Sequence, residues 1–137
     1  MIATEQFSAL DNILANSDLH SLFQPIFSLS ERRILGYEAL SRGPSNSALH
    51  SPINLFAVAR SAGRLSELEL LCRQKACQRF SQLKLEGKLF LNVSPDSLMQ
   101  PKHQPGRTLQ LLQSLGIPPS QVVIELTEQS PTDDFAL

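Results

Sequence analysis

An α/β fold with mostly parallel strands is predicted by three features of the sequence. Four short segments alternate apolar and polar residues, which is the period of a β-strand. Longer segments repeat apolar residues every three or four positions, as amphipathic helices do. After the first two strands, strands and helices alternate along the chain, which is typical of a parallel sheet. The 137 residues are 42% hydrophobic, so we expect residues 1–137 to form a single unit.

The first elements are a helix and a hairpin. Apolar residues at helical spacing predict a helix over residues 5–16, within a leading segment 1–20. Strands are predicted over 22–29 and 33–42, joined by the turn Ser-Glu-Arg-Arg. Because this turn is too short for a helical crossover, the two strands are expected to pair antiparallel.

Two helices are predicted in the middle of the chain. Ser51 before Pro52 is a helix N-cap followed by proline at the first helical position, and that helix runs to Gly63. Ser66–Glu69 has the pattern of a capping box that opens the next helix. The buried stripe of this second helix is expected to comprise Leu68, Leu71, Cys72, Ala76, Phe80 and Leu83.

The last predicted elements have connections long enough for right-handed crossovers. They are a third strand over 88–94, a helix ended by Gly116, a fourth strand over 121–128, and a helix that opens within 130–137. Leu109, Leu112 and Leu115 mark the apolar side of the helix before Gly116.

Composition argues against several classes of function. The net charge of −1 gives no basis for binding a DNA or RNA polymer or an anionic membrane. No apolar run approaches the roughly 18 residues of a membrane span, and the N-terminus lacks a signal-peptide pattern, so a cytoplasmic location is expected. Cys72 and Cys77 are expected to be buried structural thiols. The three histidines, His20, His50 and His103, have no zinc-site spacing.

Three strands carry the same arrangement of side chains. Each predicted strand has an apolar face, and on the other face an oxygen-bearing side chain stands near its carboxyl end: Glu38, Asn92 and Glu125. The carboxyl ends of parallel strands form the active face of such folds. Carboxylate and amide oxygens suit Mg²⁺, Mn²⁺ or Ca²⁺, and Arg42 has the geometry of a phosphate-binding residue.

Structural interpretations of the same residues remain open at this point. Glu38 and Arg42 could form an ion pair, because both lie on one face of the strand. Asn92 could cap the turn at Ser94-Pro95, and Glu125 could stand at a solvated strand end.

Four segments, FQPIFSL, GYEALSR, FLNVS and VIELTE, resemble the EAL domain family in their order and spacing. That family comprises bacterial cyclic di-GMP phosphodiesterases and degenerate relatives. The resemblance implies a TIM-like (β/α) barrel whose first strand is antiparallel to the rest. Because such a barrel needs about 250 residues, this chain resembles its N-terminal half, with the barrel continuing beyond Leu137.

The resemblance also implies roles for individual residues. Glu38, Asn92 and Glu125 match metal ligands, with Glu38 and Glu125 in the catalytic centre, and Glu128 matches a glutamate that stabilises a neighbouring loop. Gln24, Leu40 and Arg42 match residues that contact the dinucleotide, Arg42 through a phosphate. Where many family members have Trp after that arginine, this chain has Gly43-Pro44, so its loop is expected to take a variant form.

The function implied is hydrolysis of cyclic di-GMP to the linear dinucleotide, with two Mg²⁺ or Mn²⁺ ions. The family's Asp-Asp pair and lysine, which would complete this two-metal site, are expected to follow beyond Leu137. "TDDFAL" follows Glu128 too closely to be that pair. The chain alone is therefore expected to be inactive, and its exposed half-barrel surface to favour a homodimer or another association. The alternatives are a degenerate domain that binds cyclic di-GMP or proteins without cleavage, and a structural fragment.

Overall fold

The computed structural model describes residues 2–127, which form one four-stranded sheet with helices packed on it. Glu128 and the helix expected within 130–137 lie outside these residues. The elements in chain order are α1 (Thr4–Asn16), β1 (His20–Ser28), β2 (Arg33–Arg42), α2 (Pro52–Ser61), α3 (Leu65–Leu83), β3 (Lys88–Val93), α4 (Pro95–Leu98), α5 (Arg107–Leu115), a 3-10 turn (Pro119–Gln121) and β4 (Val122–Leu126).

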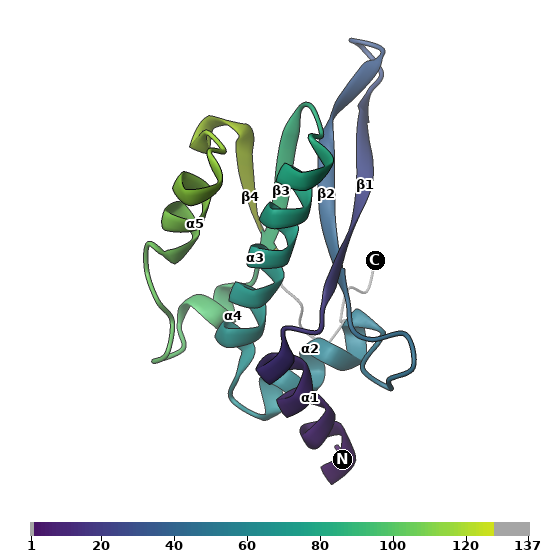
Figure 1. The fold of residues 1–137 in the computed structure, drawn as a ribbon, viewed down its shortest axis with the longest axis vertical. Helices are drawn as coiled ribbons and strands as arrows, with labels where there is room; N and C mark the ends of the chain where they lie inside the picture. Colours follow the sequence, from purple (N-terminus) through teal and green to yellow (C-terminus); the bar gives the residue numbers. More distant parts are fainter. Residues whose placement is uncertain (1, 128–137) are drawn as a thin grey trace, which may run out of the picture.

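The sheet has the strand order β1-β2-β3-β4 (Figure 1). β1 is antiparallel to β2, whereas β2, β3 and β4 run parallel to one another. The predicted α/β fold with an antiparallel first strand is therefore confirmed. Figure 1 shows α1, α2 and α4 gathered at the end of the sheet where β2 and β3 finish.

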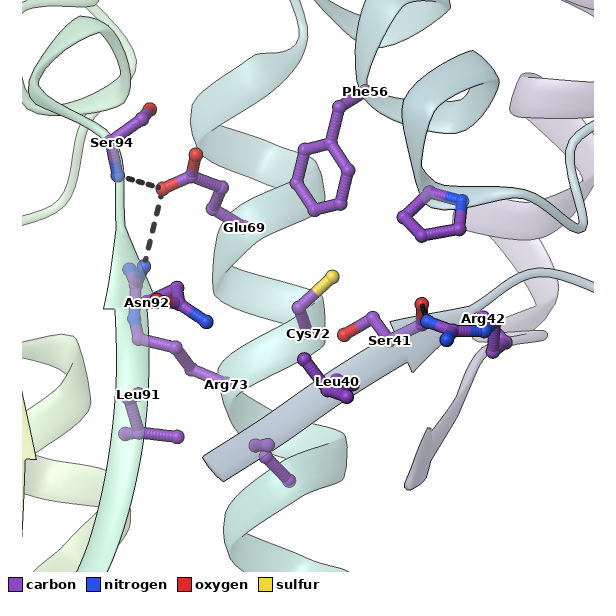
Figure 2. Close-up of a pocket in the computed structure, with 13 residues that line it drawn as sticks. Leu40, Ser41, Arg42, Phe56, Glu69, Cys72, Arg73, Leu91, Asn92 and Ser94 are labelled. Carbon is purple, nitrogen blue, oxygen red and sulfur yellow. Dashed lines mark hydrogen bonds and ion pairs between the residues drawn. The ribbon is translucent and has the colours of Figure 1, made fainter. Parts of the chain in front are cut away.

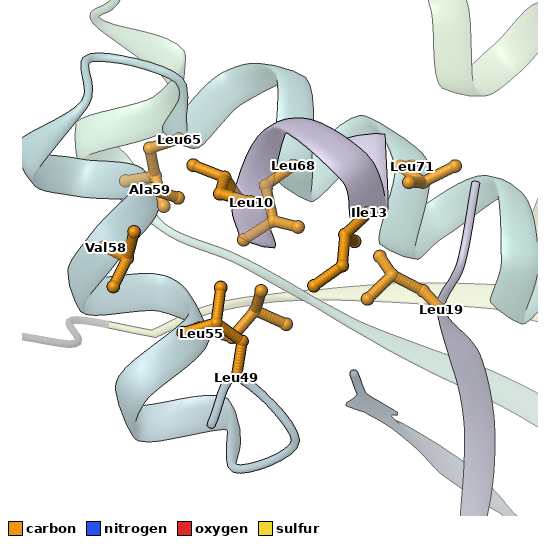
Figure 3. Packing of buried hydrophobic residues seen from close by; sticks show 10 residues of the cluster. All are labelled: Leu10, Ile13, Leu19, Leu49, Leu55, Val58, Ala59, Leu65, Leu68 and Leu71. Carbon is orange, nitrogen blue, oxygen red and sulfur yellow. The ribbon is translucent and has the colours of Figure 1, made fainter. Parts of the chain in front are cut away.

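Two groups of buried side chains hold the fold together. The first joins α1, α2 and α3 through residues that include Leu10, Leu55 and Leu68, each with no exposed surface (Figure 3). The second places α3 and α5 over the sheet, where Phe80 and Leu112 pack with Leu89 and Leu91 of β3. Tyr37 and Ala39 of β2 pack against this second group. The apolar faces predicted for β2 and β3 are thus the faces that the helices cover.

β4 is covered less than its pattern predicts. Val122 packs against the second group, but Ile124 is 48% exposed and Leu126 is 67% exposed. These two side chains line a groove with Leu98, Leu109 and Val93. The alternation of β4 was predicted correctly, but its burial was not, because burial depends on how far α5 extends over the strand.

The start of α3 differs from the predicted capping box. The helix begins at Leu65, with Arg64 at its N-cap, and Ser66 lies inside the helix and is buried. Arg64 instead binds Glu67 in the first turn, Nε to Oε1 at 2.9 Å. Leu65 has no exposed surface, so tertiary packing fixes this end of the helix. Leu83, predicted to be buried, is 43% exposed.

The described helices include none that is both long and apolar enough to cross a lipid bilayer.

Gly36 is required where β2 meets β3. A Cβ atom placed on Gly36 would lie 2.1 Å from the backbone oxygen of Lys88, and that oxygen belongs to a strand that cannot rotate away. We therefore expect Gly36→Ala to lower the free energy of unfolding by about 1–3 kcal/mol, as overpacking does, measured by urea denaturation. Leu29→Ala is the control, because Leu29 is 86% exposed in the hairpin turn. Equal stability of the two variants would show that the strands can part without cost.

Candidate active site

Parallel pairing brings the three predicted ligands to one face of the sheet. Asn92 lies directly opposite Glu125 in the β3–β4 register. Glu38 lies opposite Phe90, two residues before Asn92 on the neighbouring strand. Residues paired in this way project to the same side, so all three side chains leave the face opposite to the helices. The strand registers thus place Glu38, Asn92 and Glu125 on one face of the sheet.

The Glu125 carboxyl group lies in an environment that disfavours its ionised form. Its Oε1 atom is shielded from solvent and has no hydrogen-bond partner among the described residues. Burial raises the pKa of Glu125, and the neighbouring Glu38 carboxyl group raises it further. Two carboxylates this close disfavour full ionisation unless a cation lies between them. A solvated strand end, the structural interpretation of Glu125, does not describe this environment.

Asn92 is oriented by the strand beside it. Its Oδ1 accepts a hydrogen bond from the Thr127 hydroxyl at 3.0 Å. An amide oxygen has two lone pairs, so one stays available for a ligand. The cap of the following turn is Ser94, whose Oγ accepts from the Ser97 backbone N–H at 3.2 Å. Asn92 is therefore not the capping residue of that turn.

The donor set fits a hard divalent cation. Within residues 2–127 no three His, Cys, Asp or Glu side chains cluster as a metal site. The candidate set is instead two carboxylates and one amide oxygen, Glu38, Glu125 and Asn92. Oxygen donors suit Mg²⁺ or Mn²⁺, and the unpartnered Oε1 of Glu125 gives such an ion a buried anionic atom to bind.

The residues expected to contact the dinucleotide surround this face. Gln24 of β1 lies directly opposite Glu38, and Arg42 ends β2 opposite His20. Arg42 Nη1 donates to the Ser41 carbonyl oxygen at 2.9 Å. The ion pairs between described residues do not include one between Arg42 and Glu38. The Arg42 guanidinium therefore keeps donors that a phosphate could use.

β2 and β3 separate beside the site. Their pairing ends at Glu38 and Phe90, although both strands continue. A cleft of about 100 Å³ opens between them, with Leu40, Arg42 and Asn92 among its lining residues (Figure 2). The pattern of the sequence did not predict this cleft, because it depends on how two distant strands diverge.

Sequence reasoning also missed a buried charged pair at the base of the cleft. Glu69 and Arg73 of α3 are 4% and 7% exposed, and their Oε1 and Nη1 atoms lie 3.9 Å apart. The available signal was two opposite charges four positions apart within an apolar helical stripe.

The cysteines are unreactive in this environment. Cys72 is partly buried and lines the cleft, Cys77 lies in the core, and both are free thiols. Burial raises the pKa of the Cys72 thiol to about 12 and that of Cys77 to about 11. Neutral thiols are poor nucleophiles, which agrees with the structural role predicted for them.

The raised pKa of Glu125 predicts a pH dependence of stability in the absence of metal. Because the folded state holds this proton more tightly than the unfolded state, the stabilisation is complete below the unfolded value of 4.5. It is lost as the pH rises through the folded-state pKa. With EDTA present, Glu125→Gln is therefore expected to remove this loss and to be more stable than the wild-type chain near pH 7.

Urea denaturation of both proteins between pH 4 and pH 8 measures this difference. Glu86→Gln is the matched control, because Glu86 is exposed and lies outside the site. A Glu125→Gln variant with the wild-type pH profile would contradict the expectation.

Comparison with known proteins gives one family. The sequence matches the EAL domain family over residues 8–136. It is 32% identical over 118 residues to "Probable cyclic di-GMP phosphodiesterase PdeI" of Escherichia coli (strain K12), covering 81% of this chain and 15% of that protein.

Solved structures agree on the fold. BlrP1 of Klebsiella pneumoniae, in a calcium and cyclic di-GMP complex, superposes with a TM-score of 0.67 and 28% identity over 80% of this chain and 27% of that chain. The FimX EAL domain of Xanthomonas citri, in complex with cyclic di-GMP, gives a TM-score of 0.74 at 20% identity, covering 90% of this chain and 49% of that one. The latter likeness shows the fold alone.

This chain therefore spans a small part of PdeI and BlrP1, and about half of the FimX domain. The match over residues 8–136 extends from the first helix through all four strands and contains every candidate ligand. The chain belongs to the EAL domain family.

Proposed function

We propose that this chain contributes one half of the active site of a metal-dependent cyclic di-GMP phosphodiesterase. The complete domain would hydrolyse one phosphodiester bond of the cyclic dinucleotide, adding water across a P–O bond to give the linear product. PdeI, named as a probable enzyme of this activity, is a relative at 32% identity, and BlrP1 is a similar structure with the dinucleotide bound.

One observation of this structure carries the proposal. The Glu125 carboxyl group has a buried, unpartnered oxygen and a pKa raised by burial and by Glu38. Two adjacent carboxylates repel each other unless a shared proton, a basic side chain or a cation compensates, and none of the ion pairs between described residues includes Glu38 or Glu125. A cation-binding site accounts for two adjacent acids that lack such a partner.

The residues of the chain would have distinct roles. Glu38, Asn92 and Glu125 would hold Mg²⁺ or Mn²⁺, which when bound supply an activated water and neutralise charge on the leaving oxygen. Arg42 would bind a phosphate of the dinucleotide through charge-assisted hydrogen bonds. Gln24, opposite Glu38, and Leu40, at the cleft, would contact the rest of the substrate. Glu128, outside the described residues, would stabilise a loop at the site.

The surface of β4 supports a proposal about association. Ile124 and Leu126 are exposed, and β4 is the last strand of the described sheet. An unpaired strand edge with apolar side chains favours further pairing. The residues completing the site would reach it across this edge, either from the same polypeptide or from a second copy. We further propose that the domain acts in the cytoplasm, the location expected from the sequence.

Titration of cyclic di-GMP in the presence of Mn²⁺ tests the function in the full-length protein. Formation of the linear dinucleotide supports it, whereas binding without cleavage would indicate a receptor. Absence of binding refutes both. The chain of 137 residues by itself is expected to be inactive, so hydrolysis by the purified chain would contradict the half-site proposal.

A further inference from the structure

Glu69 and Arg73 form the most deeply buried ion pair among the described residues. Their side chains are 5% and 9% exposed. Burial lowers the pKa of Arg73, while Glu69 opposes that effect through its charge. Buried charges destabilise a fold unless they are paired and hydrogen-bonded. A buried ion pair therefore needs further hydrogen-bond partners, and both Glu69 and Arg73 have them.

Glu69 binds the turn that follows Asn92. Its Oε1 accepts from the Ser94 backbone N–H at 3.1 Å (Figure 2). The same oxygen accepts from the Ser97 hydroxyl at 2.8 Å. Ser94 also caps α4, so both ends of this short link are fixed to one carboxylate oxygen. Asn92 stands two residues before Ser94 on the same strand.

Arg73 connects this carboxylate to a second helix. Its Nε donates to the Thr108 hydroxyl of α5 at 2.8 Å, while Nη1 is buried without a hydrogen-bond partner. The guanidinium thus neutralises Glu69 and connects it to α5 at the same time. Arg73, Glu69 and Asn92 all line the cleft between β2 and β3.

Asn92 is therefore held from two sides. The hydroxyl of Thr127, which follows β4, donates to the amide oxygen of Asn92. Glu69 accepts from the backbone N–H of Ser94, two residues after Asn92. A metal ligand must be held to within about 0.5 Å of its productive position. Groups that hold ligands change metal affinity by roughly 10–100-fold when they are removed.

We propose that Glu69, supported by Arg73, is a positioning residue that sets the place of Asn92 in the metal site. This inference rests on the proposed function. The neutral variant Glu69→Gln keeps the size of the side chain but loses the charge that binds Arg73 and the Ser94 N–H. It is expected to weaken Mn²⁺ binding about 10-fold and to speed deuterium exchange in residues 94–98.

The experiment measures free Mn²⁺ by electron paramagnetic resonance during titration of the full-length protein. Two controls on α3 separate positioning from general damage. Glu67→Gln removes an exposed charge from the same helix. Leu68→Ala destabilises the same turn of α3 through the first core group, and is measured where it remains folded. Neither should change the Mn²⁺ affinity.

Each outcome decides the inference. A loss confined to Glu69→Gln supports it, and if that variant fails to fold, Ser97→Ala tests the same link and should give a smaller loss. Unchanged affinity in the folded variant overturns the positioning role, as does an equal loss in Leu68→Ala. If the wild-type protein itself binds no Mn²⁺, the metal site of the proposed function is refuted and this inference with it.

Discussion

Replacing Glu38 with alanine is expected to lower hydrolysis of cyclic di-GMP by the full-length protein by at least about 10²–10³-fold, the scale on which removal of one preorganised electrostatic group acts. Glu38 is the acid that perturbs Glu125, so its removal takes away one of the two carboxylates that this chain is proposed to supply. The remaining proposed donors, Asn92 and Glu125, lie opposite each other on adjacent strands.

The rate at saturating substrate, measured over a range of Mn²⁺ concentrations, separates metal binding from other effects. Partial recovery at high Mn²⁺ is expected, because a weakened site fills by mass action. Glu31→Gln is the matched control, since Glu31 is exposed and pairs with Arg33 in the hairpin turn. Activity of Glu38→Ala within a few-fold of the control would refute the role of Glu38 as a ligand.

Replacing Leu68 with alanine is expected to lower the free energy of unfolding by about 2–5 kcal/mol, the range for a fully buried leucine. Leu68 has no exposed surface and packs where α1, α2 and α3 meet (Figure 3). The total stability of a domain is only about 5–15 kcal/mol, so this one cavity removes a large share.

Leu83→Ala supplies the comparison within the same helix, because Leu83 is 43% exposed. It should change the denaturation midpoint little. If the two variants were equally stable, α1 and α2 would contribute little to holding α3, and the first core group would be loosely packed.

The candidate ligands could be predicted from sequence because strand alternation is local. A period of two assigns Glu38, Asn92 and Glu125 to one face whatever the rest of the fold does. The short hairpin turn fixed the direction of β1 for the same reason. These inferences needed only neighbouring residues.

Other features depended on contacts between distant segments. The pattern Ser66–Glu69 resembles a capping box, but Glu69 turns to Ser94 in the folded chain. Leu126 has the alternation of a core residue yet remains exposed, because α4 and α5 leave an open groove beside it. No local rule reports either outcome.

The narrow contact between β2 and β3 has a consequence for the order in which the molecule assembles. The β1–β2 hairpin closes when Ser28 meets Arg33, a local event, whereas β2 reaches β3 only when Gly36 meets Lys88 across all of α2 and α3. Closing so long a loop has a large entropy cost, and the three residue pairs between β2 and β3 offset little of it. This junction should therefore form late, and destabilising it should speed unfolding more than it slows refolding. Since Glu38 stands at that junction, the site would be the last part of the sheet to acquire its shape.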